Sequence, residues 1–429
     1  MNYNETIEFL YSQLPVFHMI GKAAYKANLD NTLALDSYFR YPHRKFRTVH
    51  IAGTNGKGSV SHMLSSVFQE AGYKTALFTS PHLKDYRERI RINGIMISEE
   101  AVVAFVENNT GIINELRPSF FEMSVAMAFD YFAREKVDIA IIETGLGGRL
   151  DSTNIIDPLL SIITNIGYDH MDLLGDTLGK IAVEKAGIIK KKIPVVIGET
   201  NPETENVFMQ KAMEAGSKIY FADKLYKCSM GEMNYLTGER KYMLSGLENL
   251  VRIDSKTGLG GDYQSMNIPV VACAADILKD KYDITEDHLK NGIEKAIENT
   301  GLSGRWQILN NKPLVICDTG HNKEGLSYVI RQLASINPKR IHFVIGFVND
   351  KDLSLVLPLF PKDAFYYFTK AQVPRALDPN ILKEKAGELG LKGEAYDNAG
   401  EAYRVAIAKA SDDEIVFIGG STFVVAEVV

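Results

Sequence analysis

A glycine-rich loop that carries one lysine is the part of this sequence whose residue types suggest chemistry most directly. It reads Gly53-Thr54-Asn55-Gly56-Lys57-Gly58-Ser59, and it lies between an apolar run at 49–52 and a helical pattern at 60–70. Its glycines let backbone N–H groups turn inward, the helix that follows directs its positive end at them, and Lys57 adds a full charge. The loop is therefore predicted to bind phosphate groups.

The spacing of this loop departs from the standard G-x-x-x-x-G-K-[ST] pattern. Counted from Lys57, that pattern needs glycine at position 51 and a hydroxyl at position 58, where this chain has Ile51 and Gly58. The hydroxyl comes one place later, at Ser59. A plain glycine-rich turn between strand and helix is the alternative, and the lysine and hydroxyl together argue against it.

Polar side chains also follow the neighbouring predicted strands. Glu143 closes an apolar run at 139–142, Ser80 follows a run at 75–78, and His170 follows one at 160–164. Ligands of parallel sheets bind at the carboxyl ends of the strands. A carboxylate at Glu143 could hold Mg²⁺ while the ion bridges nucleotide oxygens, although an acid at a solvent-facing strand end is also common.

Ser80 and His170 are open to simpler interpretations. Ser80-Pro81 is either an ordinary turn or an extended segment whose serine Oγ faces the same ion. Mg²⁺ prefers oxygen ligands, so chemistry alone argues against His170 as a ligand.

Three further residues are candidates on weaker grounds. Lys185 has small and apolar helix neighbours, which would lower its pKa and make the amine reactive, unless it is an ordinary exposed helix lysine. Arg305 could reach a phosphate when two domains close, or lie on the surface. Asp318 could take a ribose or a metal-bound water, or cap a helix.

The chain alternates short apolar strands with amphipathic helices, and these elements would position the candidate residues. We expect strands at 49–52, 75–78, 139–142, 160–164 and 194–197, and helices at 5–14, 60–70, 99–116, 120–135, 177–190 and 203–215. Residues 219–256 are expected to form short β segments, followed by helices at 270–278 and 286–299. This pattern predicts an α/β fold with a mostly parallel sheet flanked by helices.

A second, smaller α/β domain is predicted after the segment Thr300-Gly301-Leu302-Ser303-Gly304, whose glycines and small polar residues are typical of a hinge. Strands at 314–317, 341–345, 365–368 and 414–418 and helices at 324–333 and 399–410 are expected beyond it. The predicted organisation is an N-terminal P-loop domain at 1–299, a hinge at 300–304 and a Rossmann-like C-terminal domain at 305–429.

Composition narrows the classes of partner. The 429 residues include 48 Lys and Arg against 54 Asp and Glu, which gives a formal net charge of -6 without a long basic block. Nucleic acid and anionic membranes are therefore not expected as principal partners. The three cysteines have no metal-binding spacing, and we find neither a targeting pattern nor an apolar run of membrane-spanning length, so a cytoplasmic protein is expected.

Four motifs together resemble folylpolyglutamate synthase/dihydrofolate synthase, a family of Mur-ligase-like amide ligases. They are Gly53-Thr54-Asn55-Gly56-Lys57-Gly58-Ser59, Ser80-Pro81-His82-Leu83, Glu143-Thr144-Gly145-Leu146-Gly147-Gly148-Arg149-Leu150-Asp151 and Glu184-Lys185-Ala186-Gly187. The matches keep the order of the family and, with Asp318 to His321, cover most of the chain.

The resemblance implies particular roles. Gly53 and Thr54-Asn55-Gly56-Lys57-Gly58-Ser59 would hold ATP phosphates, with Asn267, Arg305, Asp318 and His321 as further ATP contacts. Ser80, Glu143 and His170 would bind two magnesium ions, and Lys185 would be the family's carbamylated lysine. Ser119-Phe120-Phe121-Glu122 and Leu150-Asp151-Ser152 would line the pterin pocket. Lys57, Lys185, His170 and Arg305 would form the catalytic set.

The implied reaction is ATP-dependent joining of a carboxylate to an amine. ATP would convert the carboxylate to an acyl phosphate, and the amine of L-glutamate would attack it, with dihydropteroate or a reduced folate as the carboxylate substrate and a monomer as the active form. A cell-wall Mur ligase is one rival, disfavoured by the order Lys57-Gly58-Ser59. A P-loop switch is another, but Asn322-Lys323-Glu324-Gly325 lacks the final acid of the guanine-binding N/T-K-x-D pattern.

The sequence departs from the family at three places. The family has histidine before the glutamine where this chain has Tyr263-Gln264, and alanine before the histidine where it has Gly320-His321. The pterin-side loop of the family matches only weakly at 25–29. These differences concern adenine contact and pterin preference.

Overall fold

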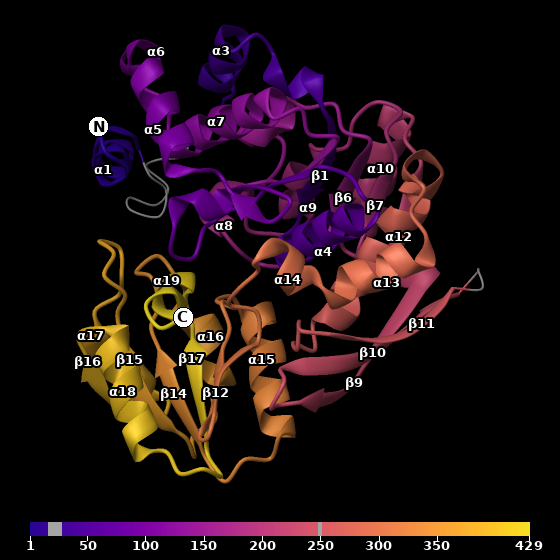
Figure 1. The fold of residues 1–429 in the computed structure, drawn as a ribbon. Coiled ribbons are helices and arrows are strands. Elements are labelled where there is room, and N and C mark those ends of the chain that lie inside the picture. Colours follow the sequence, from indigo (N-terminus) through magenta and orange to yellow (C-terminus); the bar gives the residue numbers. More distant parts are fainter. Residues whose placement is uncertain (16–27, 248–250) are drawn as a thin grey trace. The chain divides into compact units, whose positions relative to one another are not determined.

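The computed structural model describes residues 1–15, 28–247 and 251–429, which form two compact units (Figure 1). The first unit comprises Met1–Ser229, Tyr242–Ser255 and Ser265–Leu302, and the second comprises Met230–Lys241, Lys256–Gln264 and Ser303–Val429. Two segments from the predicted first domain thus belong with the second unit. Most of the weakly matching segment at 25–29 lies outside the described residues.

An eight-stranded sheet forms the centre of the first unit, in the order β4-β3-β2-β5-β1-β6-β7-β8. Six neighbouring strands from β2 to β8 run parallel, and β3 and β4 are antiparallel at one edge. The strands are β1 (Arg47–Ala52), β2 (Thr75–Phe78), β3 (Ile90–Ile92), β4 (Ile95–Met96), β5 (Ile139–Glu143), β6 (Leu160–Ile163), β7 (Val195–Ile197) and β8 (Ile219–Phe221). The predicted mostly parallel sheet is confirmed.

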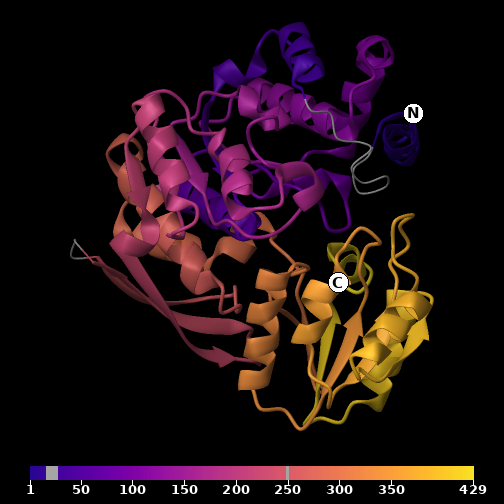
Figure 2. The same ribbon diagram turned by 180° about the vertical axis from the view of Figure 1, so that it is seen from behind.

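Helices cover both faces of this sheet, as the two opposite views show (Figures 1 and 2). They are α1 (Tyr3–Gln13), α3 (Asp30–Tyr38), α4 (Lys57–Glu70), α5 (Glu99–Asn108), α6 (Thr110–Leu116), α7 (Phe120–Arg134), α8 (Met171–Leu174), α9 (Leu178–Ala186), α10 (Glu205–Ala215), α11 (Ala222–Leu225), α12 (Gln264–Tyr282), α13 (Glu286–Glu294) and α14 (Ala296–Thr300). Short 3-10 turns are η2 (Pro42–Lys45), η3 (Tyr86–Arg89) and η4 (Ser152–Ile155).

Alternation along the strands explains this arrangement, because successive side chains point to opposite faces of a sheet. Ala140 and Ile142 of β5 pack with α7, and Ala52 and Ile163 pack with α9 and α10. Helix α4 packs against β1, β2 and β5 and is covered in turn by α13 and α14. Burial on both faces accounts for the nearly continuous apolar runs of these strands.

A three-stranded sheet in the order β11-β10-β9 occupies the region where short β segments were expected. Its strands are β9 (Tyr226–Asn234), β10 (Glu239–Gly246) and β11 (Arg252–Thr257). The turn at Thr237-Gly238 joins β9 to β10 and contains a positive φ of 74° at Gly238. A left-handed conformation of this kind is readily adopted by glycine.

The second unit contains a six-stranded sheet in the order β12-β13-β17-β14-β15-β16, in which only β12 is antiparallel. Its strands are β12 (Gln307–Asn311), β13 (Leu314–Cys317), β14 (Ile341–Ile345), β15 (Phe365–Thr369), β16 (Gly393–Tyr396) and β17 (Ile415–Gly419). Its helices are α15 (Lys323–Ser335), α16 (Leu353–Val356), η5 (Leu357–Leu359), α17 (Pro379–Glu388), α18 (Ala399–Lys409) and α19 (Thr422–Ala426). The predicted second α/β unit is confirmed.

None of the helices in the described part of the chain combines the length and the apolar character that crossing a bilayer requires.

Candidate active site

The glycine-rich loop leaves the carboxyl end of the central strand β1 and is shaped by two glycines. At Gly53 φ is 149°, and a Cβ atom there would lie 1.9 Å from Thr164 Oγ1. At Gly56 φ is 83°, and a Cβ atom would lie 2.3 Å from Asn267 Oδ1. Both positions therefore require glycine, and Asn267 lies beside the loop.

The segment that follows β6 holds the first half of the loop. The backbone N–H of Thr54 donates to Asn165 O at 3.0 Å, and that of Asn55 donates to Asn165 Oδ1 at 2.8 Å. The Thr54 hydroxyl accepts from the backbone N–H of Gly167 at 3.0 Å, and Thr164 Oγ1 donates to Asn55 O at 2.5 Å. These bonds fix the loop from its outer side.

Helix α4 begins at Lys57, three residues earlier than the helix predicted at 60–70, with Gly56 as its N-cap. In the described residues no side chain caps this end. The first N–H groups of a helix lack partners inside the helix, and together with the helix dipole they attract anions. Gly58 and Ser59, in this first turn, are thus placed where a phosphate would be bound.

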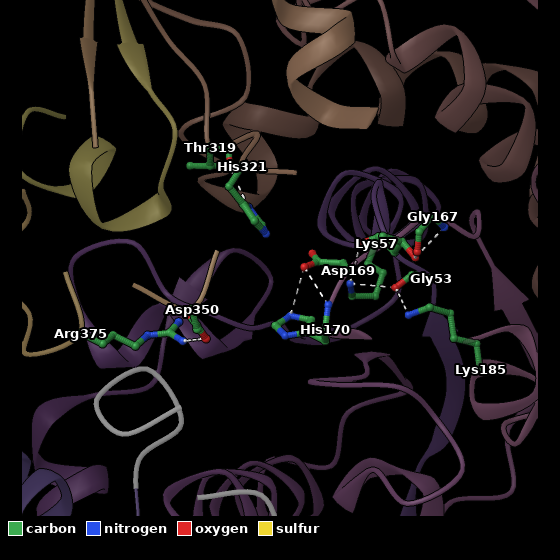
Figure 3. Close-up of polar contacts among 11 residues, drawn as sticks. Gly53, Lys57, Gly167, Asp169, His170, Lys185, Thr319, His321, Asp350 and Arg375 are labelled. Carbon is green, nitrogen blue, oxygen red and sulfur yellow. Dashed lines mark hydrogen bonds and ion pairs between the residues drawn. The ribbon is translucent and has the colours of Figure 1, made fainter. Parts of the chain in front are cut away.

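Lys57 and Lys185 both donate to the carbonyl oxygen of Gly53, as Figure 3 shows. The Nζ–O distances are 3.0 Å for Lys57 and 2.7 Å for Lys185, and Lys57 also donates to Thr54 O at 3.1 Å. Lys185 is buried rather than exposed, which excludes the simpler interpretation of this residue. Burial, with the nearby charge of Lys57, lowers the pKa of Lys185 to about 7, against the opposing effect of Asp169 and Asp151.

The predicted metal ligands come from three strand ends. Glu143, the last residue of β5, is buried and accepts a hydrogen bond from the backbone N–H of Ser80 at 3.3 Å. His170 adopts a left-handed conformation with φ of 51°, and its ring lies next to Asp169, with 4.0 Å between Nε2 and Oδ1 (Figure 3). A carboxylate and a hydroxyl fit the oxygen preference of Mg²⁺, which takes its other ligands from phosphate and water.

The described residues contain no group of three or more His, Cys, Asp or Glu side chains that could hold one metal ion. The assignment of Ser80, Glu143 and His170 to magnesium therefore stays a prediction. The structure brings Ser80 and Glu143 into contact.

The residues predicted to line the pterin pocket divide into two kinds. Ser119 and Glu122 form a capping box for α7, in which each side chain accepts from the backbone N–H of the other. Their polar atoms thus stabilise a helix end. Phe121 instead lies against the loop after β5, because a Cβ atom on Gly145 would come within 2.5 Å of its ring. The Phe120 ring stacks on Tyr11 with centroids 5.2 Å apart.

Asp151 organises the loop that follows Glu143. Its carboxylate accepts from the backbone N–H groups of Gly145 and Leu146 at 2.9 Å each, and from the N–H and hydroxyl of Thr153 at 3.0 and 2.5 Å. Burial raises the pKa of Asp151, and these hydrogen bonds oppose the rise. The neighbouring Ser152 is buried at the start of η4, whereas Leu150 is half-buried.

Two residues outside the motifs, His50 and Thr153, extend this network. The Thr153 hydroxyl, which donates to Asp151, lies 2.8 Å from Nε2 of His50. Burial lowers the pKa of His50 to about 3, with a smaller effect from Lys190, so the ring is neutral. A polar residue inside an otherwise apolar strand was the only signal in the sequence for His50.

Asp318 is the centre of the polar cluster in the second unit. Its buried carboxylate accepts from the Tyr263 hydroxyl at 2.6 Å, the Trp306 N–H at 2.8 Å and the Gly320 N–H at 2.7 Å. Burial raises the pKa of Asp318, and burial with the Asp318 charge raises that of Tyr263. Asn322, not Asp318, is the N-cap of α15, so the helix-cap interpretation of Asp318 is wrong.

Arg305 and His321 both contact Thr319. The Arg305 side chain is half-buried and donates to the Thr319 hydroxyl, and His321 Nδ1 lies 3.1 Å from Thr319 O. After neighbouring strands β14 and β15, Arg375 pairs with Asp350 at 3.0 Å (Figure 3), an ion pair that no sequence pattern indicated. Thr319 and His321 follow β13, Asp350 follows β14 and Arg375 follows β15, at the carboxyl ends where α/β sheets bind ligands, whereas Arg305 precedes β12.

Comparisons with known proteins agree with this geometry. Residues 51–275 match the Mur ligase middle domain, and residues 304–422 match the Mur ligase, glutamate ligase domain. A dihydrofolate synthase/folylpolyglutamate synthase of Bacillus subtilis is 34% identical over 418 residues, which cover 95% of each chain.

Two solved structures are similar over nearly the whole chain. Folylpolyglutamate synthase from Thermotoga maritima has a TM-score of 0.81 and 32% identity, and the match covers 99% of this chain and 95% of that one. FolC of Escherichia coli in complex with DHPP and ADP has a TM-score of 0.85 and 27% identity, with 100% and 97% covered.

Proposed function

The chain belongs to the folylpolyglutamate synthase/dihydrofolate synthase family of Mur ligases, and on that premise we propose that it joins L-glutamate to a pterin-bearing carboxylate at the expense of ATP. The carboxylate is that of dihydropteroate, the γ-carboxyl of a reduced folate, or both in turn. It is an ATP-dependent amide-forming ligase of folate metabolism.

The observation that carries this proposal is the convergence of Lys57 and Lys185 on the Gly53 carbonyl beside an uncapped helix end. The oxygen of a carboxylate is a poor leaving group, so an amine cannot displace it directly. ATP activates the carboxylate by transferring a phosphoryl group to it, which forms an acyl phosphate. Lys57 and the first N–H groups of α4 neutralise charge on the transferring group.

Other residues of the first unit hold the reactants. We assign Ser80, Glu143 and His170 to two magnesium ions and Asn267 to ATP. Support comes from the buried Glu143 carboxylate at the end of β5 and from the close approach of Asn267 to Gly56. In the second unit, Arg305, Asp318 and His321 are proposed to contact ATP.

Lys185 is proposed to act as a carbamate. An amine with a pKa of about 7 is largely neutral at physiological pH, and only the neutral amine adds to carbon dioxide. The addition forms an N–C bond, breaks an N–H bond and one C–O π bond and releases one proton, so it converts a buried neutral amine into an anion. That anion would lie near a magnesium ion and the loop lysine.

The rival functions are weaker. A cell-wall ligase shares the Mur ligase domains, but the relatives that match over the whole chain are named as folate enzymes. A P-loop switch is not supported by either matched domain. We propose the cytoplasm as the compartment, supported by the free thiols of Cys228, Cys273 and Cys317, and a monomer as the active form, which light scattering would test.

Release of ADP from ATP tests the proposed function. It should be measured with dihydropteroate, with tetrahydrofolate and with a nucleotide–peptide precursor, each with and without L-glutamate. Turnover that needs both glutamate and one of the two pterins is expected. Turnover with the nucleotide–peptide precursor but with neither pterin would instead identify a cell-wall ligase.

A further inference from the structure

Arg89 is a buried arginine that none of the motifs above includes. It is the last residue of η3, and only 4% of its surface is exposed. Its carbonyl oxygen accepts from the backbone N–H of Thr79, next to Ser80. The backbone of Arg89 therefore lies close to the predicted metal ligand Ser80.

The contacts of its side chain are an imidazole and an aromatic ring. Arg89 Nε donates to His82 Nδ1 at 2.7 Å, and the guanidinium lies over the Phe120 ring at 5.2 Å from the centroid. Since Nδ1 accepts this bond, the proton of neutral His82 is on Nε2, which lies 3.1 Å from the Tyr11 hydroxyl. His82 thus orients Arg89 but contributes no negative charge.

Among the residues that the structure describes, no carboxylate forms an ion pair with Arg89, and its terminal nitrogens have no hydrogen-bond partner. Glu88, its neighbour in the chain, accepts instead from the backbone N–H groups of Leu83, Lys84 and Asp85. Arg87, two residues away and 22% exposed, pairs with Asp85 at 2.7 Å and Glu99 at 3.3 Å.

A buried guanidinium without an ion-paired carboxylate is costly, because it has lost its water and the Glu143 and Glu88 charges offset that loss only in part. Burial accordingly lowers the pKa of Arg89, against the effect of Tyr86, Tyr11 and the Glu143 carboxylate. Arginine presents a planar pair of donors that matches a carboxylate. An arginine kept buried with these donors unused therefore indicates a ligand anion.

We propose that Arg89 binds the carboxylate of the pterin-bearing substrate and holds it for activation. This inference rests on the proposed function and names a residue that recognises its substrate. The aromatic rings around Arg89, Phe120 and Tyr11 with Tyr86 at 5.5 Å from Phe120, favour a carboxylate carried on an aromatic ring, as in dihydropteroate.

Binding of two ligands to two variants tests this assignment. Dissociation constants of dihydropteroate and of its decarboxylated analogue should be measured by fluorescence in the presence of ADP and Mg²⁺. For wild type we expect the carboxylate to strengthen binding, and for Arg89→Met we expect dihydropteroate binding to weaken roughly 10- to 100-fold while the analogue is unaffected. Arg87→Met is the matched control and should keep the wild-type preference.

The outcomes separate the possible failures. If Arg89→Met keeps the wild-type preference for the carboxylate, or loses affinity for both ligands equally, the assignment is wrong and Arg89 is structural. If wild type binds neither pterin, the proposed function itself fails. Should Arg89→Met not fold, Arg89→Lys keeps the charge without the paired donors, and an unchanged preference in that variant would equally overturn the assignment.

Discussion

Replacing Lys185 with methionine should remove a steep pH dependence from the stability of the first unit. The folded-state pKa of Lys185 is about 7, below the value of about 10.4 for an unfolded lysine. Between these values the unfolded chain holds a proton that the folded chain has released, so stability increases with pH. The increase is about 1.4 kcal/mol per pH unit, and it is absent when the side chain cannot titrate.

Urea denaturation at pH 7.5, 8.5 and 9.5, in buffer free of carbon dioxide, would measure this effect. The unfolding free energy of wild type should increase relative to that of Lys185→Met by about 1.4 kcal/mol for each pH unit. This increase corresponds to about a tenfold change in the ratio of their folding equilibrium constants. Lys180→Met changes a lysine on the same helix that is 63% exposed, and its curve should stay parallel to wild type. Parallel curves for Lys185→Met as well would refute the lowered pKa and remove the basis for the carbamate.

Three further outcomes follow from the site geometry. Gly53→Ala places a Cβ atom 1.9 Å from Thr164 Oγ1, so a loss of ATP-dependent turnover is expected, with a lower melting temperature measured by calorimetry. Asp151→Asn weakens the acceptor of the N–H groups of Gly145 and Leu146, and KM for the pterin is expected to rise in steady-state assays; an unchanged KM would place that loop outside the substrate site. Tyr263→Phe removes the hydroxyl bonded to Asp318 and should weaken ATP binding roughly tenfold by calorimetric titration, whereas unchanged affinity would contradict the proposed ATP contact of Asp318.

The sheet cores could be predicted from sequence because strands buried on both faces are continuous apolar runs. β2, β13 and β14 have the predicted bounds, whereas β3, β4, β12 and β16, at or next to the sheet edges, were missed because they are very short or carry polar residues. The helix expected at 99–116 is divided at Asn109, and the start of α4 was placed three residues late. In a sequence, a glycine such as Gly56 indicates a loop. In the structure Gly56, with φ of 83°, is the N-cap of α4.

The candidate site was predictable only where a functional group belongs to a characteristic local sequence motif. The glycine loop and the acid after β5 are of this kind, because backbone geometry demands glycine at fixed positions beside them. The burial of Lys185 was left open, since whether a helix lysine faces the sheet depends on packing against β1. His50 contacts Thr153 from 103 residues away in the chain, and Thr153 in turn contacts Asp151, a relation that spacing does not express.

The segment Arg87-Glu88-Arg89-Ile90-Arg91 shows why tertiary burial adds information of another kind. Its three arginines look alike in sequence, but Arg87 pairs with carboxylates near the surface and Arg91 donates to the carbonyl oxygens of Glu88 and Gly94. Of these three arginines only Arg89 is buried, and among the described residues no carboxylate forms an ion pair with it. Burying the Arg89 guanidinium without an ion-paired carboxylate lowers the stability of the folded protein. We therefore infer that an anionic ligand, rather than a side chain of this protein, pairs with it.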